Sequence, residues 1–262
     1  MRKRYWSELN TNDFVGLDPE TTIAVLPIAA TEQHGPHLPV ATDTAIAEGM
    51  IGETIRQVPE DLAVLFLPTQ AIGKSNEHLR SPGTITLSAE TALRSWIEIG
   101  EAVHRAGLRK LILVNSHGGN VDVISIVARD LRVRLQMLVV ACHWGRFGQP
   151  KGLYTDQELA VGIHAGDIET SLMLHFRPDL VRMDKAENFA PATIRISNEF
   201  ELLRPTGHTA FGWIAQDLHQ SGAAGDASRA TAEKGKATAE FRAAQFIKLL
   251  QDVTRFSLDR LA

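Results

Sequence analysis

Short apolar runs alternate with longer segments of helical periodicity through the first half of the chain. The runs are rich in β-branched residues, and they predict four strands: Thr22–Ile28, Ala63–Pro68, Leu111–Asn115 and Met137–Cys142. The segments between them predict helices over Thr44–Gln57, Ala89–Ala106 and Val121–Arg134. Such alternation is typical of βα units around a mostly parallel sheet, so the predicted fold class is α/β.

The second half of the chain has a looser pattern. A polar, glycine-containing stretch follows Trp144, and a helix is then predicted over Ala165–Phe176, where Arg177–Pro178 ends it. Residues 183–226 show few regular signals, and their prolines and glycines indicate an ordered loop region that could form one wall of a site. A last helix is predicted over Ala227–Val253; it carries Ala, Glu and Lys throughout, so we expect it to pack on the outside.

Length and charge exclude several classes of protein. A chain of 262 residues with 44% hydrophobic side chains can bury one large core, so we expect a single domain over residues 1–262. The net charge is −4 and no dense Lys/Arg cluster is present, so nucleic acid is not an expected partner. No apolar run approaches the roughly 20 residues of a membrane span, so no membrane partner is expected either.

Cysteine usage and the basic start of the chain bear on the compartment. Cys142 is the only cysteine, so no disulfide can form within the chain and a reducing compartment is expected. The basic residues Met1–Arg4 are not followed by the apolar segment of a secretory signal. We therefore expect a soluble cytoplasmic protein.

Potential metal ligands are densest directly after the first predicted strand. Glu32 and His34 are two residues apart and point the same way in extended backbone, and Asp43 opens the next predicted helix. Sites in open α/β sheets form beyond the carboxyl ends of strands, which is where this block lies. Carboxylate and imidazole ligands suit Zn, Mn or Fe, and an aspartate can bridge two such ions. The alternative for this block is a hydrogen-bonded polar loop.

A second candidate segment ends the third predicted strand. It reads Asn115-Ser116-His117-Gly118-Gly119-Asn120, so His117 lies at the same edge of the sheet as Glu32. The glycines let the backbone approach a ligand closely, which favours a role in binding. A plain strand-to-helix turn with Asn120 as the N-cap is the alternative.

A third candidate segment starts the predicted helix at Ala165. His164 at the helix entry could face a cleft and carry protons, because its ordinary pKa is near neutrality. Glu169 follows about one and a half turns later. For Asp167 we favour capping of the helix N-terminus over a chemical role.

Further residues are expected to line a substrate pocket at the same end of the sheet. Ser75, Glu77 and His78 follow the second predicted strand, where a polar loop closed by a Pro-Gly turn is the alternative. His143–Trp144 follows the fourth predicted strand. Together with Gly118, the expected substrate-binding set is Ser75, Glu77, His78, Gly118 and Trp144.

In this order, the segments resemble the creatininase family of metal-dependent amidohydrolases and related hydrolases. The Glu-Gln-His-Gly-Pro-His block at Glu32–His37 is highly specific, and the resemblance runs from Trp6–Leu9 through Pro82–Thr84 and Glu169–Ser171 to Ala232–Gly235. It implies a three-layer α/β/α sandwich with a mostly parallel central sheet. It also implies a homo-oligomer, commonly a hexamer.

The resemblance implies a centre of two divalent ions per subunit, Zn, Mn or Fe. Glu32 and His117 are implied as ligands of one ion, His34 of the other, and Asp43 as the bridge. In creatininase itself the segment matching His117–Gly119 reads His-Tyr-Glu, and that glutamate completes the second metal site. This chain has Gly119 there, so we nominate Glu169 as the replacement.

His164 matches the histidine that family mechanisms use for proton transfer, while Ile163 replaces the acidic residue that precedes it in creatininase. Together with Gly119, this argues against creatinine itself as the substrate. The expected reaction is hydrolysis of a non-peptide C–N amide bond in a small cyclic or linear substrate, by water that the metal activates. Alternatives within the family are a formamide, a terminal peptide bond or a cyclic ketone.

Two other classes of protein are alternatives to a hydrolase. A non-catalytic metal-binding subunit is the first, although a purely structural site has no use for a proton carrier such as His164. A Rossmann-like nucleotide binder is the second, but no Gly-x-Gly-x-x-Gly follows the first predicted strand. The hydrolase interpretation is therefore preferred.

Overall fold

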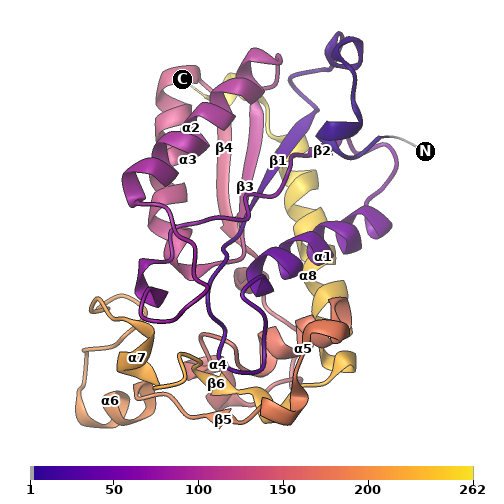
Figure 1. Cartoon of the computed structure of the whole chain (residues 1–262). Coiled ribbons are helices and arrows are strands. Elements are labelled where there is room, and N and C mark those ends of the chain that lie inside the picture. The colour runs from indigo at the N-terminus through magenta and orange to yellow at the C-terminus, as the bar shows by residue number, and fades with distance from the viewer. Residues whose placement is uncertain (1–2, 262) are drawn as a thin grey trace.

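A four-stranded parallel sheet lies at the centre of the fold, in a computed structural model that describes residues 3–261 (Figure 1). Its strands are β1 (Ile23–Ile28), β2 (Val64–Phe66), β3 (Lys110–Asn115) and β4 (Leu138–His143), in the order β2-β1-β3-β4. All three neighbouring pairs are parallel. The predicted α/β class with a parallel sheet is confirmed.

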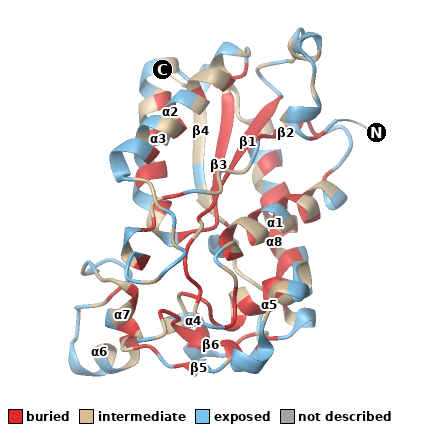
Figure 2. Cartoon of the chain, viewed as in Figure 1, coloured by how far each residue is buried: buried red, intermediate tan, exposed pale blue. Residues whose placement is uncertain are grey.

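Helices cover both faces of this sheet, which gives the three layers (Figure 1). They are α1 (Thr42–Gln57) and α8 (Ala232–Arg255) on one face, and α2 (Ala89–Arg105) and α3 (Val121–Leu135) on the other. Alternate strand residues serve the two layers: Ile23 and Val25 pack with the α1 and α8 side, whereas Ala24 and Leu26 pack with the α2 and α3 side. Strands β1, β2 and β3 are therefore buried on both faces, whereas the edge strand β4 is only partly buried, as Figure 2 shows.

The segment between β4 and α8 covers the carboxyl ends of the strands (Figure 1). It contains α4 (Asp156–Val161), α5 (Asp167–Phe176), β5 (Asn188–Phe189), α6 (Thr193–Glu199), α7 (Ala215–Leu218) and β6 (Gly225–Asp226). The stretches predicted as loose therefore hold short helices and a two-stranded sheet, which are too short to give a clear periodic signal. The wall predicted from residues 183–226 is largely ordered structure.

Two helix starts differ from the prediction. Helix α5 begins at Asp167, because Ala165 has a positive φ of 54° and cannot lie in a right-handed helix. Helix α8 begins at Ala232, where the Thr231 side chain accepts a hydrogen bond from the backbone N–H of Lys234. Residues 227–229 form a separate 3-10 turn.

Helix α8 is an outer layer with one buried face. Phe246 and Leu250 are fully buried in the core between α8 and the sheet. At its C-terminal end, the buried Lys110 of β3 donates through Nζ to the carbonyls of Val253, Thr254 and Phe256. The expectation that α8 packs on the outside holds for its exposed face only, since these contacts fix it to the sheet.

The strand order places the site. The chain passes from β1 to β2 on one side and then returns to β3 on the other, so the direction of winding changes between β1 and β3. Loops that leave the carboxyl ends of such neighbouring strands diverge and form a crevice. Residues 29–41 after β1 and residues 116–120 after β3 therefore meet at one edge.

Within residues 3–261, no helix combines the length and apolar character needed to cross a membrane. Met1 and Arg2 of the basic N-terminal segment, and Ala262, lie outside the described residues. The expectation of a single domain over residues 1–262 stays a prediction.

Candidate metal centre

The structure brings the predicted ligands together at the crevice between β1 and β3. Their side chains form three groups, and within each group the potential ligand atoms lie within 4.8 Å of one another. The groups are Glu32, His34 and His164; Glu32, Glu77 and His117; and His34, Asp43 and Glu169. Residues from four separate segments of the sequence thus converge on one place. The nominated Glu169 lies in the group that contains His34.

Asp43 stands between the two histidines of the centre. It is the second residue of α1 and is 2% exposed. Its Oδ1 lies 3.7 Å from His34 Nε2, and its Oδ2 lies 3.5 Å from His117 Nδ1. Ser116 donates from Oγ to the Asp43 carbonyl at 3.0 Å, which ties the start of α1 to the end of β3. One carboxylate oxygen thus faces each histidine, an arrangement suited to bridging two cations.

A backbone contact fixes which nitrogen of His34 faces the centre. Its Nδ1 lies 3.0 Å from the carbonyl oxygen of Glu32, to which an Nδ1–H can donate. The lone pair of Nε2 then points toward Asp43 and toward Glu169 Oε2 at 3.8 Å. This tautomer is the form that binds a metal ion.

In His117 the other ring nitrogen, Nε2, faces a backbone carbonyl, so its tautomer is the opposite of that of His34. Its Nε2 lies 3.0 Å from the Lys74 carbonyl and 3.3 Å from Glu77 Oε1, both of which can accept a hydrogen bond. Its Nδ1 faces Glu32 Oε1 at 3.1 Å. The Nε2–H tautomer leaves the Nδ1 lone pair free toward Glu32 and Asp43.

Several buried acceptor atoms of this cluster lack a hydrogen bond to any described residue. They are Glu32 Oε1 and Oε2, His34 Nε2 and Asp43 Oδ2. Buried acceptors without donors are costly and rare in folded proteins. Because they converge, a divalent cation would satisfy them together, and the mixture of carboxylate and imidazole suits Zn, Mn or Fe. The donor set therefore fits a metal centre.

Burial and charge shift the pKa values of these groups strongly. Burial opposes protonation of His34, but Asp43 and Glu169 outweigh it and raise the pKa of His34 to about 9. Burial raises the pKa of Glu169 to about 7. Burial also favours a raised pKa for Glu32, yet His117 lowers it below the ordinary value. The carboxylates thus draw positive charge into the crevice.

His164 lies at the edge of the cluster. Its Nε2 is 2.8 Å from the Gln33 carbonyl, and its Nδ1 faces Glu32 Oε1 at 3.7 Å. Burial, together with the nearby His34, lowers the pKa of His164 well below its ordinary value. The ring is placed to exchange a proton through Nδ1 on the side of the cluster.

The predicted pocket residues after β2 surround His117 and Glu32. Ser75 Oγ lies 3.3 Å from His117 Nε2, and His78 Nε2 lies 3.4 Å from Glu32 Oε1. Glu77 faces His117 rather than open space. Their expected role in binding substrate stays a prediction.

Gly119 explains how Glu77 reaches His117. A Cβ at position 119 would lie 2.3 Å from Glu77 Oε1 and 2.4 Å from the Lys74 carbonyl, closer than atoms can approach. The glutamate that creatininase carries at this position cannot fit here, and the Glu77 carboxylate occupies that space. Gly118, in contrast, has no atom near the position of a Cβ.

Gln33 has a role that its place in the Glu32–His37 block did not predict. Its Nε2 contacts His78 Nδ1 at 2.7 Å and donates to the Gly222 carbonyl at 2.9 Å, while its Oε1 accepts from the Gly35 N–H. It therefore fixes the loop after β1 to the segment before β6. Nothing in its local sequence distinguishes it from a surface glutamine.

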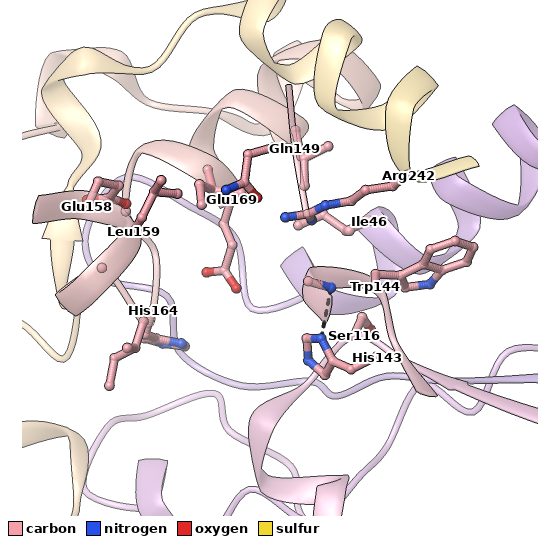
Figure 3. Close-up of a pocket in the computed structure, with 16 residues that line it drawn as sticks. Ile46, Ser116, His143, Trp144, Gln149, Glu158, Leu159, His164, Glu169 and Arg242 are labelled. Carbon is pink, nitrogen blue, oxygen red and sulfur yellow. Dashed lines mark hydrogen bonds between the residues drawn. The ribbon is translucent and has the colours of Figure 1, made fainter. Parts of the chain in front are cut away.

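A cavity of about 280 Å³ adjoins the centre (Figure 3). Its walls include His164 and Glu169 on the side of the cluster, and His143, Trp144 and Arg242 beyond them. His143 and Trp144 thus both line a cavity, while the substrate-binding role expected for Trp144 stays a prediction. Asn120 occupies the N-cap position of α3, as the alternative interpretation of its segment had it, but its side chain donates to the Ala29 carbonyl and accepts from the Lys74 N–H instead of capping the helix.

Arg242 was missed because it lies in a helix that looks exposed. Ala239, Ala243 and Phe246 recur at helical spacing around it and are buried, so this periodicity could have placed Arg242 on the inner face of α8.

For Asp167, the sequence favours capping of the helix N-terminus. It lies in the first turn of α5, but its carboxylate pairs with Lys234 Nζ at 2.5 Å.

Known proteins resemble this chain over most of its length. The family model "Creatininase: Creatinine amidohydrolase" matches residues 7–250. The chain is 30% identical over 234 residues to the mycofactocin precursor peptide peptidase of Mycolicibacterium smegmatis, covering 88% of this chain and 85% of that protein. It is 32% identical over 187 residues to the creatinine amidohydrolase of Pseudomonas putida, covering 65% and 70%.

A solved structure named "Creatininase Mn" superposes on the chain with a TM-score of 0.76. The alignment covers 97% of this chain and 100% of that chain, at 23% sequence identity. At this identity the likeness establishes the common fold, including the parallel sheet whose edge carries the centre.

Proposed function

Because this chain belongs to the creatininase family of hydrolases, we propose that it hydrolyses a C–N amide bond of a small cyclic or linear substrate with two divalent metal ions. The observation that carries the proposal is the convergence of buried acceptor atoms from Glu32, His34 and Asp43 that no described donor satisfies. A non-catalytic metal-binding subunit remains the alternative from another class.

The ligand positions follow from the two tautomers. Glu32 and His117 would hold one ion, His34 and Glu169 the other, and Asp43 both. When bound, such ions lower the pKa of water toward about 7 and polarise a carbonyl. The ligand types suit Zn, Mn or Fe, and the family structure named for Mn supports that range.

The side chains around the ions position and transfer protons. His164, held at Nε2 by the Gln33 carbonyl, presents Nδ1, which would take the proton released by the attacking water and pass it to the leaving nitrogen. The Lys74 carbonyl and Glu77 hold the ring of His117 in its ligand orientation. Bulk water has little access to the carboxylate of Glu32, since this residue is fully buried.

The relatives indicate two kinds of amide. One is named for a peptide bond and the other for creatinine. Gly119 and Ile163 depart from the creatininase pattern, so we favour an open-chain amide, including a terminal peptide bond, over creatinine. Hydrolysis of a cyclic ketone stays a weaker prediction.

Cellular context is part of the proposal. We place the protein in the cytoplasm as a homo-oligomer of the hexameric kind, acting on a small-molecule amide without nucleic acid or membrane as partner. Ile126 and Val133 of α3 are exposed and seven residues apart, so they share a helix face that another copy could cover. Sedimentation of the purified protein measures this state directly.

A metal-dependence experiment tests the proposed function. Protein stripped with a chelator and reloaded with Zn, Mn or Fe is assayed on formamides, lactams and dipeptides. We expect hydrolysis only after reloading, and its loss in Asp43→Asn. Asp122→Asn, an exposed residue in the first turn of α3, is the matched control. Metal-loaded protein that cleaves none of these amides would leave the non-catalytic alternative.

A further inference from the structure

Arg242 is a buried cation without a carboxylate partner among residues 3–261. It lies on α8 and is 5% exposed. Its Nε donates to the Gly148 carbonyl at 3.0 Å, and no described carboxylate forms an ion pair with it. A guanidinium offers five N–H donors, so most of them are left for a ligand.

The free donors face the cavity beside the metal centre. Figure 3 shows Arg242 reaching from α8 into the space that Glu169 and His164 border on the other side. Gln149 and Ser116 add polar groups to the same walls. A ligand that fills the cavity would therefore touch both Arg242 and the edge of the centre.

Arg242 is the one cation among the described residues of these walls. Burial lowers the pKa of Arg242 to about 10, which keeps the side chain protonated at neutral pH. Burial also lowers the pKa of His143 to about 3, so that imidazole is neutral. A buried positive charge is costly without an opposite charge. Glu158 and Glu169 also line the cavity, but no described carboxylate forms an ion pair with Arg242, so its charge is left for a bound anion to pair with directly.

We propose that Arg242 binds a carboxylate group of the substrate, so that the enzyme acts on amides that carry a carboxylate close to the bond that is cut. This rests on the proposed function, and it names the substrate class of that site. The planar guanidinium can bind a carboxylate through two parallel hydrogen bonds. A doubly charged phosphate fits less well, because Glu158 and Glu169 also line the small cavity.

A pair of dipeptide probes tests the proposal by calorimetric binding. Glycylglycine carries the carboxylate, and glycylglycinamide replaces it with a neutral amide of similar shape. Hydrogen bonds to charged groups contribute about 1.5–3 kcal/mol, so we expect glycylglycine to bind metal-loaded protein about 10- to 100-fold more tightly. Arg242→Gln should remove this preference, and Arg242→Lys should keep part of it.

The control variant is Arg255→Gln, an exposed arginine at the end of the same helix. It should bind both probes like the unchanged protein. Metal content and melting temperature of each variant are measured alongside, so that a misfolded Arg242→Gln is recognised and Arg242→Lys then carries the comparison. Metal-stripped protein provides a further arm, because the preference that comes from Arg242 should persist without the ions.

Three results would overturn the proposal: equal binding of the two probes by the unchanged protein, a preference that survives in folded Arg242→Gln, or inorganic phosphate competing as well as glycylglycine. These are separable from failure of the proposed function. Hydrolysis of amides without any carboxylate preference would refute the role of Arg242 alone. A carboxylate preference that depends on Arg242, without hydrolysis of any amide, would refute the hydrolase alone.

Discussion

The two ring nitrogens of His117 have different surroundings, and this difference decides how the residue can act. Nε2 faces the Lys74 carbonyl and Glu77, whereas Nδ1 faces Glu32 and Asp43. A carboxylate behind a histidine ligand fixes its tautomer and strengthens it as a ligand. Glu77 would therefore act on a bound metal through His117.

Replacing Glu77 by Gln should weaken metal binding. The Lys74 carbonyl still holds the ring, so we expect a loss at the low end of the usual 10- to 100-fold range for residues behind a ligand. Competition with a chromophoric chelator measures the affinity. Glu98→Gln, at an exposed position of α2, is the control and should not change it. Unchanged affinity in Glu77→Gln would remove Glu77 from the centre.

His164→Ala separates proton transfer from metal binding. A general acid or base contributes about 10²- to 10⁴-fold to the rate, so turnover should fall by that factor while both ions stay bound. Turnover and metal content are measured on the same sample. A variant that loses an ion would identify His164 as a ligand, as its proximity to Glu32 and His34 also permits.

The centre could be predicted at residue level because its ligands cluster near strand ends. Glu32, His34 and Asp43 lie within twelve residues of one another, and His117 follows a strand that the apolar pattern reveals. Arg242 is different, because only the packing of α8 turns it into the cavity. Contacts between distant segments have no local signal in a single sequence.

Helix α8 approaches α5 closely at one glycine. A Cβ at Gly235 would lie 1.9 Å from the Ser171 carbonyl oxygen, so the two helices pack backbone to backbone at this point. Because α5 begins three residues after His164, this contact holds the start of α5, including Glu169, in place.

Gly235→Ala should therefore destabilise the protein. Overpacking costs about 1–3 kcal/mol, because the helices must move apart. Gly52→Ala in α1 is the matched control: its Cβ would meet only the end of the Arg56 side chain, so it should be neutral or stabilise by up to about 1 kcal/mol. Denaturant unfolding measures both variants. Equal stability of the two would contradict the close packing.

At the scale of elements, the sheet and its main helices followed from the apolar pattern. The four strands match within a few residues, and α1, α2 and α3 lie where they were predicted. The start of α5 could not be predicted, because the positive φ of Ala165 is imposed by its surroundings. Local periodicity determines long elements, whereas tertiary contacts determine where the short ones begin.

The whole molecule holds several carboxylates in one buried crevice. Glu32, Asp43 and Glu169 converge there, and repulsion between their negative charges opposes folding; a bound cation, or a proton on His34, whose pKa is about 9, offsets it. A ligand that binds only the folded state at 100 times its Kd adds about 2.7 kcal/mol to stability.

Removal of the metal should lower the melting temperature by several degrees, and reloading should restore it. Differential scanning calorimetry on stripped and reloaded protein measures the change. Asp43→Asn removes a charged ligand from both ions. We therefore expect this variant to melt at nearly the same temperature with and without metal. If the unchanged protein melts at the same temperature with and without metal, cations do not stabilise the crevice.

The most direct measurement is a crystal structure of metal-loaded protein with anomalous scattering data collected at the absorption edge of the metal. We predict two anomalous peaks in each subunit, one between Glu32 and His117 and one between His34 and Glu169, with Asp43 touching both. No peak at this edge of the sheet, or peaks only elsewhere on the molecule, would contradict the metal centre and the function proposed from it.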